Sequence, residues 1–406
     1  MFSNWIPNQV GNDIYGALLI MKFILPYILI AILSIIDCSC TRTDNEEKTG
    51  EYQTKAHWPV FRGDNNLSGF TSQQVPDDPS LLWTFDSGSE IVSSAVMDSE
   101  SVYIGALDGK MYSLNIQNGT RNWEFDSGDE IEASALLAEK TLYFGNLAGD
   151  FFALNSGDGA LLWKDSLESA IHGSANWTKS ENGQLLILVG GYNNKMHCFD
   201  AENGTLLWDF ETDGYINGTP AVYKNKTAFG GCDEKLHVLS VDNGEKAAVI
   251  NAGSYVPGSP AIVDGKAYLG HFNNEVMCID IETDQIVWKF SDGKNKSPFF
   301  SSPAVSEDRL VIGSRNGQIY CLDRASGKKM WSFRTQDEVD SSPVIAHDKV
   351  ISGSADGRLY ILDLESGEKI WHYEIGAEII GCPAVSAGMI IIGADDGRLY
   401  AFGEQK

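Results

Sequence analysis

The stretch DGRLYILDLESGEKIW, residues 356–371, contains the pattern that decides the fold. It begins at the dipeptide Asp356-Gly357, carries a second turn at Ser366-Gly367 and ends at Trp371. A tryptophan returns about every forty residues, with Ala248 where one is missing. The full set is Trp83, Trp123, Trp163, Trp208, Trp288, Trp331 and Trp371. A fixed period of this length is typical of a repeat architecture.

Each repeat contains two turns and short alternating runs between them. Asp-Gly and Asn-Gly dipeptides suit two-residue hairpins, which need positive φ at both central positions. The second turn carries a glycine in most repeats, but Asp284 takes that place in the fifth. Apolar and polar residues alternate between the turns, as in residues 349–353 and 358–362. This alternation predicts four antiparallel strands per repeat, which is the blade of a β-propeller.

The number of repeats predicts an all-β, eight-bladed propeller of four-stranded antiparallel blades. The eighth repeat begins its hairpin at Asp396-Gly397, and the sequence ends at Lys406, before an outermost strand could form. Residues 81–85, around Trp83, are an outer strand with no blade before it. We expect this strand to complete the last blade and close the ring, which removes unpaired edges. The tryptophans should pack between blades, and Ala248 should leave one junction less well filled or filled by another side chain.

The acidic composition limits the kinds of partner that the protein can bind. The formal net charge is −26. A strongly acidic surface disfavours nucleic acid, whose binding requires Lys and Arg against phosphates. It also disfavours tight adsorption to anionic membrane surfaces.

The N-terminus predicts export. Residues 1–20 match neither a signal nor a folded element, so Met21 is the expected start and 1–20 a gene-model extension. Residues 21–39 read as a lipoprotein-type signal peptide, because Lys22 precedes an apolar run too short for a membrane span. Cys40 is the preferred lipidation site; Cys38, simple secretion and a retained anchor are the alternatives. Residues 40–57 read as a flexible tether and 58–406 as the propeller domain.

Residues 360–371 and the segment Trp58–Gly63 resemble the repeat and the opening of propellers of the pyrroloquinoline-quinone (PQQ) type. Within that superfamily, the size, compactness and signal resemble the BamB-type family of outer-membrane assembly lipoproteins. This resemblance implies a non-enzymatic scaffold without a cofactor, which binds a protein partner, such as an integral outer-membrane protein, through loops on one face. The alternative is a quinoprotein dehydrogenase of alcohols or sugars that binds PQQ with Ca²⁺. The chain lacks the adjacent cysteine pair and the long insertions of those enzymes.

The channel mouth is the predicted place for a site. One position per repeat forms a ring there, comprising Val92, Glu132, His172, Asn217, Pro257, Phe300, Asp340 and Ile380. Glu132, Asn217 and Asp340 are candidate ligands for Ca²⁺, and His172 is a candidate for proton transfer. The preferred interpretation is that unrelated polar residues line a wet channel mouth, with no metal and no catalytic residue.

Aromatic residues on the same rim predict a partner surface. Tyr215, Tyr255, Phe299 and Phe300 are the candidates, since aromatic residues are enriched at interface hot spots. Ordinary rim packing and a carbohydrate-binding surface are the alternatives. The sequence therefore predicts a monomeric propeller in the bacterial cell envelope, attached to the outer membrane only through its lipid. It does not decide between the periplasmic and the exterior side.

Overall fold

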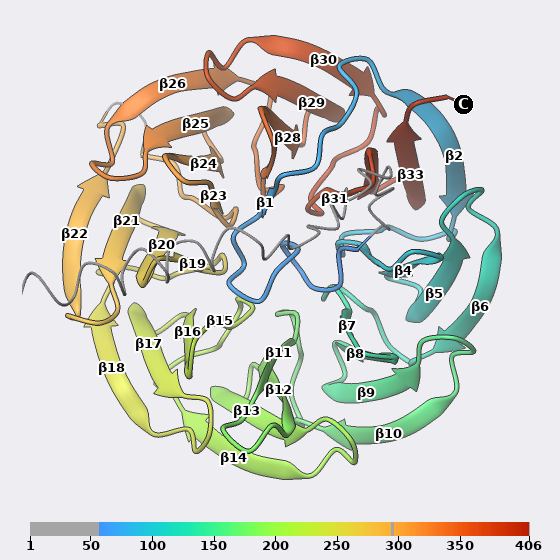
Figure 1. Ribbon diagram of the computed structural model, residues 1–406, viewed down its shortest axis with the longest axis vertical. Helices are drawn as coiled ribbons and strands as arrows, with labels where there is room; N and C mark the ends of the chain where they lie inside the picture. Colours follow the sequence, from blue (N-terminus) through green and yellow to red (C-terminus); the bar gives the residue numbers. More distant parts are fainter. Residues whose placement is uncertain (1–56, 294–295, 406) are drawn as a thin grey trace, which may run out of the picture. The chain divides into compact units, whose positions relative to one another are not determined.

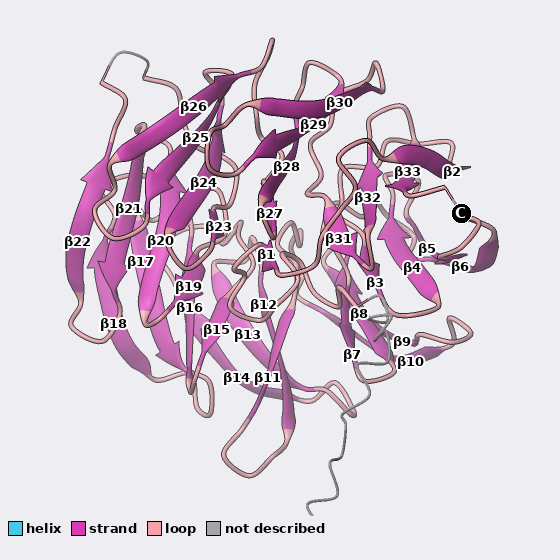
Figure 2. Cartoon of the chain, turned by 45° about the horizontal axis from the view of Figure 1, so that its top comes forward, coloured by secondary structure: helices cyan, strands magenta, loops and turns pink. Residues whose placement is uncertain are grey.

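The computed structural model describes residues 57–293 and 296–405, which form a ring of eight blades (Figure 1). The predicted eight-bladed, all-β propeller is confirmed. No helix among these residues is long and apolar enough to span a membrane. Figure 2 shows only strands and loops over this part of the chain. The predicted extension, signal peptide, lipidation site Cys40 and nearly all of the tether lie outside the described residues.

Each blade has four antiparallel strands, numbered from the channel outward. The short strand β1 (Phe70–Thr71) and the early strand β2 (Ser80–Asp86) precede the first blade. In blade seven β1 forms a short fifth strand, which runs parallel to the innermost strand, β27 (Val344–Ala346). Blade one consists of β3 (Val96–Met97), β4 (Ser101–Gly105), β5 (Lys110–Asn115) and β6 (Arg121–Asp126), and blade two of β7 (Leu136–Ala138), β8 (Thr141–Gly145), β9 (Asp150–Asn155) and β10 (Leu161–Ser166). Blade three consists of β11 (Asn176–Lys179), β12 (Leu185–Gly190), β13 (Lys195–Asp200) and β14 (Leu206–Glu211), and blade four of β15 (Ala221–Tyr223), β16 (Lys226–Gly230), β17 (Lys235–Ser240) and β18 (Lys246–Asn251). Blade five consists of β19 (Ala261–Val263), β20 (Lys266–His271), β21 (Glu275–Asp280) and β22 (Gln285–Phe290), and blade six of β23 (Ala304–Val305), β24 (Arg309–Ser314), β25 (Gln318–Asp323) and β26 (Lys329–Arg334). Blade seven contains β27 (Val344–Ala346), β28 (Lys349–Gly353), β29 (Arg358–Asp363) and β30 (Lys369–Glu374). Blade eight consists of β31 (Ala384–Ser386), β32 (Met389–Gly393) and β33 (Arg398–Gly403), completed by β2.

Ring closure occurs where the sequence predicts it. Strand β2 pairs antiparallel with β33, with Trp83 opposite Ala401 and Asp86 opposite Arg398. The two ends of the domain therefore share one sheet (Figure 1). Because β33 also pairs with β32, it lies inside the sheet, and β2 forms the outer edge of the eighth blade.

Tryptophans of the outer strands connect neighbouring blades. Six indoles donate their Nε1–H to a backbone carbonyl of the next blade, at 2.9 or 3.0 Å. In each of these junctions the indole covers a turn glycine with positive φ. A Cβ at Gly244, for example, would lie 2.6 Å from the ring of Trp208. Tryptophan and glycine are thus required as a pair.

The two irregular repeats meet at the same junction. Ala248 occupies the tryptophan position of β18, and Asp284, with a φ of 60°, occupies the glycine position of the next blade. Without an indole, the turn has space for a side chain. Ala248 is instead buried in an aliphatic cluster with Ile250, Met277 and Ile281. The junction is therefore filled by other side chains, which is one of the two outcomes expected from the sequence.

Residues 57–73, here called the N-terminal segment, cross one end of the channel and bond to the inner strands (Figure 1). Backbone contacts run from Trp58 to blade one, and from residues 65 to 71 to blades four to seven. The remaining links to blades two, three and eight involve the carbonyl of Pro59 and the side chains of Asn65 and Gln73. One extended segment thus contacts all eight blades.

Arg62 anchors the middle of this segment. Its side chain is fully buried and donates to the carbonyls of Pro303 at 3.0 Å and Ser342 at 3.1 Å, and to the Sγ of Cys382 at 3.1 Å. A Cβ at Gly69 would collide with the guanidinium, so the segment folds back over Arg62 only because glycine stands there.

Candidate functional site

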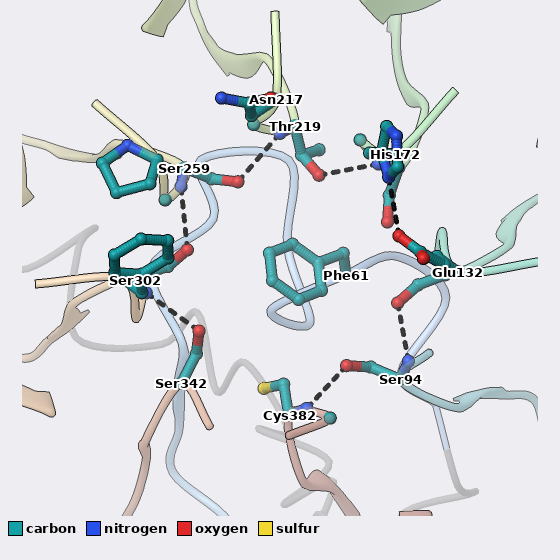
Figure 3. A pocket seen from close by; sticks show the side chains of 18 of the residues that line it. Phe61, Ser94, Glu132, His172, Asn217, Thr219, Ser259, Ser302, Ser342 and Cys382 are labelled. Carbon is teal, nitrogen blue, oxygen red and sulfur yellow. Dashed lines mark hydrogen bonds and ion pairs between the residues drawn. The ribbon is translucent and has the colours of Figure 1, made fainter. Parts of the chain in front are cut away.

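A cavity of about 230 Å³ lies on the propeller axis, at the open end of the channel. The ring of Phe61, from the N-terminal segment, forms its floor and lies in the centre of the surrounding side chains (Figure 3). The walls come from the residues that precede the innermost strands. These backbones approach closely: a Cβ at Gly258 would lie 2.8 Å from the carbonyl oxygen of Phe300. Small residues are therefore required at this level of the channel.

Hydroxyl side chains line the cavity in what we call the hydroxyl ring. Its members are Ser94, Ser134, Ser174, Thr219, Ser259, Ser302 and Ser342. At most junctions a hydroxyl oxygen accepts the backbone N–H of the matched residue in the preceding blade; for example, the Oγ of Ser259 accepts from the N–H of Thr219 at 2.8 Å. The eighth blade contributes Cys382, whose N–H bonds to the Oγ of Ser94 at 2.7 Å. Burial raises the pKa of the Cys382 thiol.

The predicted ligand ring is only partly assembled. Glu132 and His172 come from adjacent blades and meet, with Oε2 and Nδ1 2.6 Å apart (Figure 3). Asn217 lines the same cavity, and its Oδ1 is buried without a hydrogen-bond partner. Asp340 lies apart from them: it accepts three bonds from Arg315, at 3.0, 3.0 and 2.6 Å, and does not line the cavity. Its hydrogen bonds raise the pKa of Arg315.

These residues do not fit a calcium-bound quinone. Glu132 is the one carboxylate among the lining residues, because Asp340 is held by Arg315 outside the cavity. Within residues 57–293 and 296–405, no group of three His, Cys, Asp or Glu side chains could hold a metal ion. The quinone also carries carboxylates, whereas the one arginine of the mouth is already paired with Asp340 and with Glu338 at 3.3 Å. The site thus lacks both the ligands that Ca²⁺ requires and a free positive charge for the carboxylates of the quinone.

Aromatic side chains form an arc along one half of the mouth. The arc consists of Tyr192, Tyr215, Tyr255, Phe272 and Phe300. Tyr192 and Tyr215 are stacked, with centroids 4.7 Å apart and planes inclined by 7°. Phe272 contacts both Tyr255 and Phe300, at 6.2 and 6.1 Å. Tyr215, Tyr255 and Phe272 are 50%, 47% and 49% exposed.

The expected role of Phe299 in the rim needs correction. Its side chain is fully buried in the cluster between blades five and six, where it packs 5.9 Å from Tyr320 and against the backbone of Gly270. Of two consecutive residues, only one can face the mouth, and here it is Phe300. The guanidinium of Arg315 lies over the Phe300 ring, 3.5 Å from its centroid.

Sequence reasoning missed Tyr192, Phe272 and Arg315. These residues occupy one matched position, directly before the hairpin dipeptide that follows the second strand of a blade. That position across the repeats is Leu107, Leu147, Tyr192, Cys232, Phe272, Arg315, Ala355 and Asp395. The comparison across repeats that predicts the channel-mouth ring predicts a second ring when it is applied to this position.

The other half of the mouth is acidic. Asp395 lies near Glu90 and Glu378, and its backbone N–H bonds to the carbonyl of Glu378 at 3.0 Å. Burial, followed by repulsion from these two carboxylates, raises the pKa of Asp395 to about 6. Repulsion among these carboxylates is reduced when a cationic group lies beside them, so this half of the mouth favours cations.

Comparison with known proteins agrees with this architecture. A family model described as outer membrane protein assembly factor BamB matches residues 72–186, 182–271, 250–331 and 272–405. No curated protein sequence matches the chain.

Solved structures show the same fold. BamB from Moraxella catarrhalis has a TM-score of 0.69 and 16% identity, with 80% of this chain and 100% of that chain covered. The computationally designed Ika8 protein has a TM-score of 0.71 and 19% identity, with coverage of 80% and 99%. Quinohemoprotein alcohol dehydrogenase from Comamonas testosteroni has a TM-score of 0.72 and 13% identity, with coverage of 88% and 82%. At these identities the likeness shows the fold alone.

Proposed function

The chain belongs to the family described as outer membrane protein assembly factor BamB, and we propose that it is a non-enzymatic scaffold that binds a protein partner at the channel mouth. The observation that carries the proposal is the aromatic arc. Three of its side chains are about half exposed, Arg315 lies over a fourth, and the carboxylates of Glu90, Glu378 and Asp395 lie close to one another on the other half of the mouth. Aromatic residues of this kind supply large contact area at low entropic cost.

We further propose that the protein is exported and lipidated at Cys40, and that it acts at the outer membrane on an integral membrane protein. The support is the signal-like segment 21–39 together with the family description. A lipid at the end of a tether would leave the mouth of a monomeric propeller free for its partner.

Affinity capture from the membrane fraction tests the scaffold proposal. The full chain should recover an integral outer-membrane protein, and the double variant Tyr215→Ser/Tyr255→Ser should recover at least about tenfold less, because hot-spot truncations typically cost more than 1 kcal/mol each. Leu162→Ser is the matched control, since Leu162 is 53% exposed but lies on the outer strand β10. Equal recovery by the double variant and by this control would contradict docking at the mouth.

The dehydrogenase alternative has only the shared fold in its favour. It requires that added PQQ and Ca²⁺ give a quinone absorbance and dye-linked oxidation of alcohols or sugars. We expect neither, because Asp340 is paired with Arg315 outside the cavity, which leaves Glu132 as the one carboxylate among the lining residues. Activity that depends on both additions would overturn the non-enzymatic proposal.

A further inference from the structure

The cavity beneath the mouth offers a specific set of groups to a guest. Its floor is the face of Phe61, which is only partly buried, and its wall carries the carboxylate of Glu132. The unpartnered Oδ1 of Asn217 and the oxygens of the hydroxyl ring add acceptors. None of the lining side chains is a lysine or an arginine. The guanidinium of Arg62 lies behind the lining, where it donates to the carbonyl of Ser342 and to the Sγ of Cys382. An aromatic face, a carboxylate and several neutral oxygens together make a binding site for an organic cation.

The size of the cavity limits the guest. Pockets for drug-sized ligands span roughly 300–1,000 Å³, whereas this cavity measures about 230 Å³. It is closed below by Phe61 and the N-terminal segment, so a guest must enter from the mouth (Figure 3). The available space suits one side-chain head group with its methylenes, and the rest of the guest must lie on the mouth itself.

The surroundings favour the approach of a cation. The carboxylates of Glu90, Glu378 and Asp395 border the mouth, and burial together with repulsion from the other two raises the pKa of Asp395. The positive charge of Arg315 is neutralised by Asp340 and Glu338. A field of one sign around a narrow opening concentrates ligands of the opposite sign.

We propose that the cavity receives one lysine or arginine side chain of the partner protein, while the aromatic arc contacts the residues around it. This inference rests on the proposed scaffold function and specifies what the partner presents. In the bound state the ammonium or guanidinium would lie over Phe61, donate to Glu132 and Asn217, and leave the pair of Glu132 and His172 in place. The partner motif is thus a basic residue flanked by apolar ones.

Two peptides that differ only in charge test the proposal. The probes are acetyl-Gly-Leu-Arg-Leu-Gly-amide and the same peptide with citrulline, which keeps the shape of arginine but carries no charge. Binding of each to the full chain is measured by calorimetry or by NMR. We expect the arginine peptide to bind about tenfold more tightly, because hydrogen bonds to charged groups are the stronger class. Equal affinities would overturn the proposal.

Variants locate the binding. Glu132→Gln should weaken the arginine peptide by about tenfold and leave the citrulline peptide unchanged, whereas Glu130→Gln, an exposed neighbour that does not line the cavity, should change neither. Phe61→Leu should weaken the arginine peptide about threefold through loss of the aromatic face. Thermal unfolding shows whether each variant is folded. An unchanged affinity in folded Glu132→Gln would overturn the assignment to this cavity.

Comparison with membrane capture separates the two proposals. If capture at the mouth succeeds but the arginine peptide shows no preference, the scaffold stands and the cationic pocket fails. If folded protein prefers arginine but captures no partner, the scaffold fails, and a free amine, rather than a partner side chain, is the guest. If Glu132→Gln weakens both the peptide and the captured partner, both proposals are supported.

Discussion

At the scale of single residues, one tryptophan and one glycine hold neighbouring blades together. Trp208 donates to the carbonyl of Val241 at 2.9 Å, and its ring covers Gly244. Gly244 has a φ of 68°, so both the available space and the backbone conformation require glycine. Each of the six junctions of this kind therefore constrains two positions at once, and the junction of Ala248 with Asp284 departs from the rule at both.

This pairing makes a prediction for the irregular junction. Ala248→Trp alone should destabilise the protein by about 2 kcal/mol, because the indole would meet the Cβ of Asp284. Adding Asp284→Gly should restore the stability, with a coupling energy of about 1 kcal/mol or more between the two changes. Urea unfolding of the four proteins measures this coupling. Simple additivity would show that the two positions are independent.

Asp395 provides a pH test. Because its pKa is raised to about 6 in the folded protein, the folded state holds the proton more tightly than the unfolded state. Its contribution to stability is therefore lost as the pH rises from about 4 to about 6. Asp395→Asn should gain about 1 kcal/mol at neutral pH, after discounting for solvent screening, and nothing below a pH of about 4. A difference in unfolding free energy between the two proteins that stays constant from pH ~4 to pH ~8 would contradict the raised pKa.

At the scale of elements, the N-terminal segment is the unusual part. Adjacent blades are joined by short loops and by the tryptophan junctions, but among the residues that the structure describes this segment alone contacts every blade. It also places Phe61 at the floor of the cavity. The same stretch of chain therefore stabilises the ring and shapes the site.

Arg62 tests this dual role. Arg62→Met should cost about 3 kcal/mol of unfolding free energy, because the carbonyls of Pro303 and Ser342 would lose charged donors in a buried place. The matched control is Arg121→Met on β6, where the side chain is 52% exposed and a change within ~0.5 kcal/mol is expected. Similar losses in the two variants would refute an anchoring role for Arg62.

The sequence predicts those elements whose signals are local and repeated. Turn dipeptides and the tryptophan period specify strands, blades and closure through Trp83, because each depends on nearby residues or on register. The path of the N-terminal segment has no periodic signal; its regular part is the two-residue strand β1. Matching positions across the repeats predicts that Glu132 and His172 lie on adjacent blades. It predicts neither their contact nor the pairing of Asp340 with Arg315. Those depend on side-chain directions that a period does not encode.

At the scale of the whole molecule, the ring presents a rigid mouth whose two halves differ in chemistry. The aromatic arc lies on blades three to six, and the acidic group around Asp395 lies where blades eight and one meet. The net charge of −26 adds a long-range attraction for basic surfaces, which accelerates association more than it strengthens binding. Together these features describe a docking surface for a partner with a basic, apolar motif.

Site-specific photo-crosslinking in cells tests this account most directly. A photoreactive residue at position 215, in the aromatic arc, should crosslink to an integral outer-membrane protein, whereas the same residue at position 162, on the equally exposed perimeter, should not. Crosslinking of the partner from position 162 but not from position 215, or no crosslink from either, would contradict docking at the channel mouth.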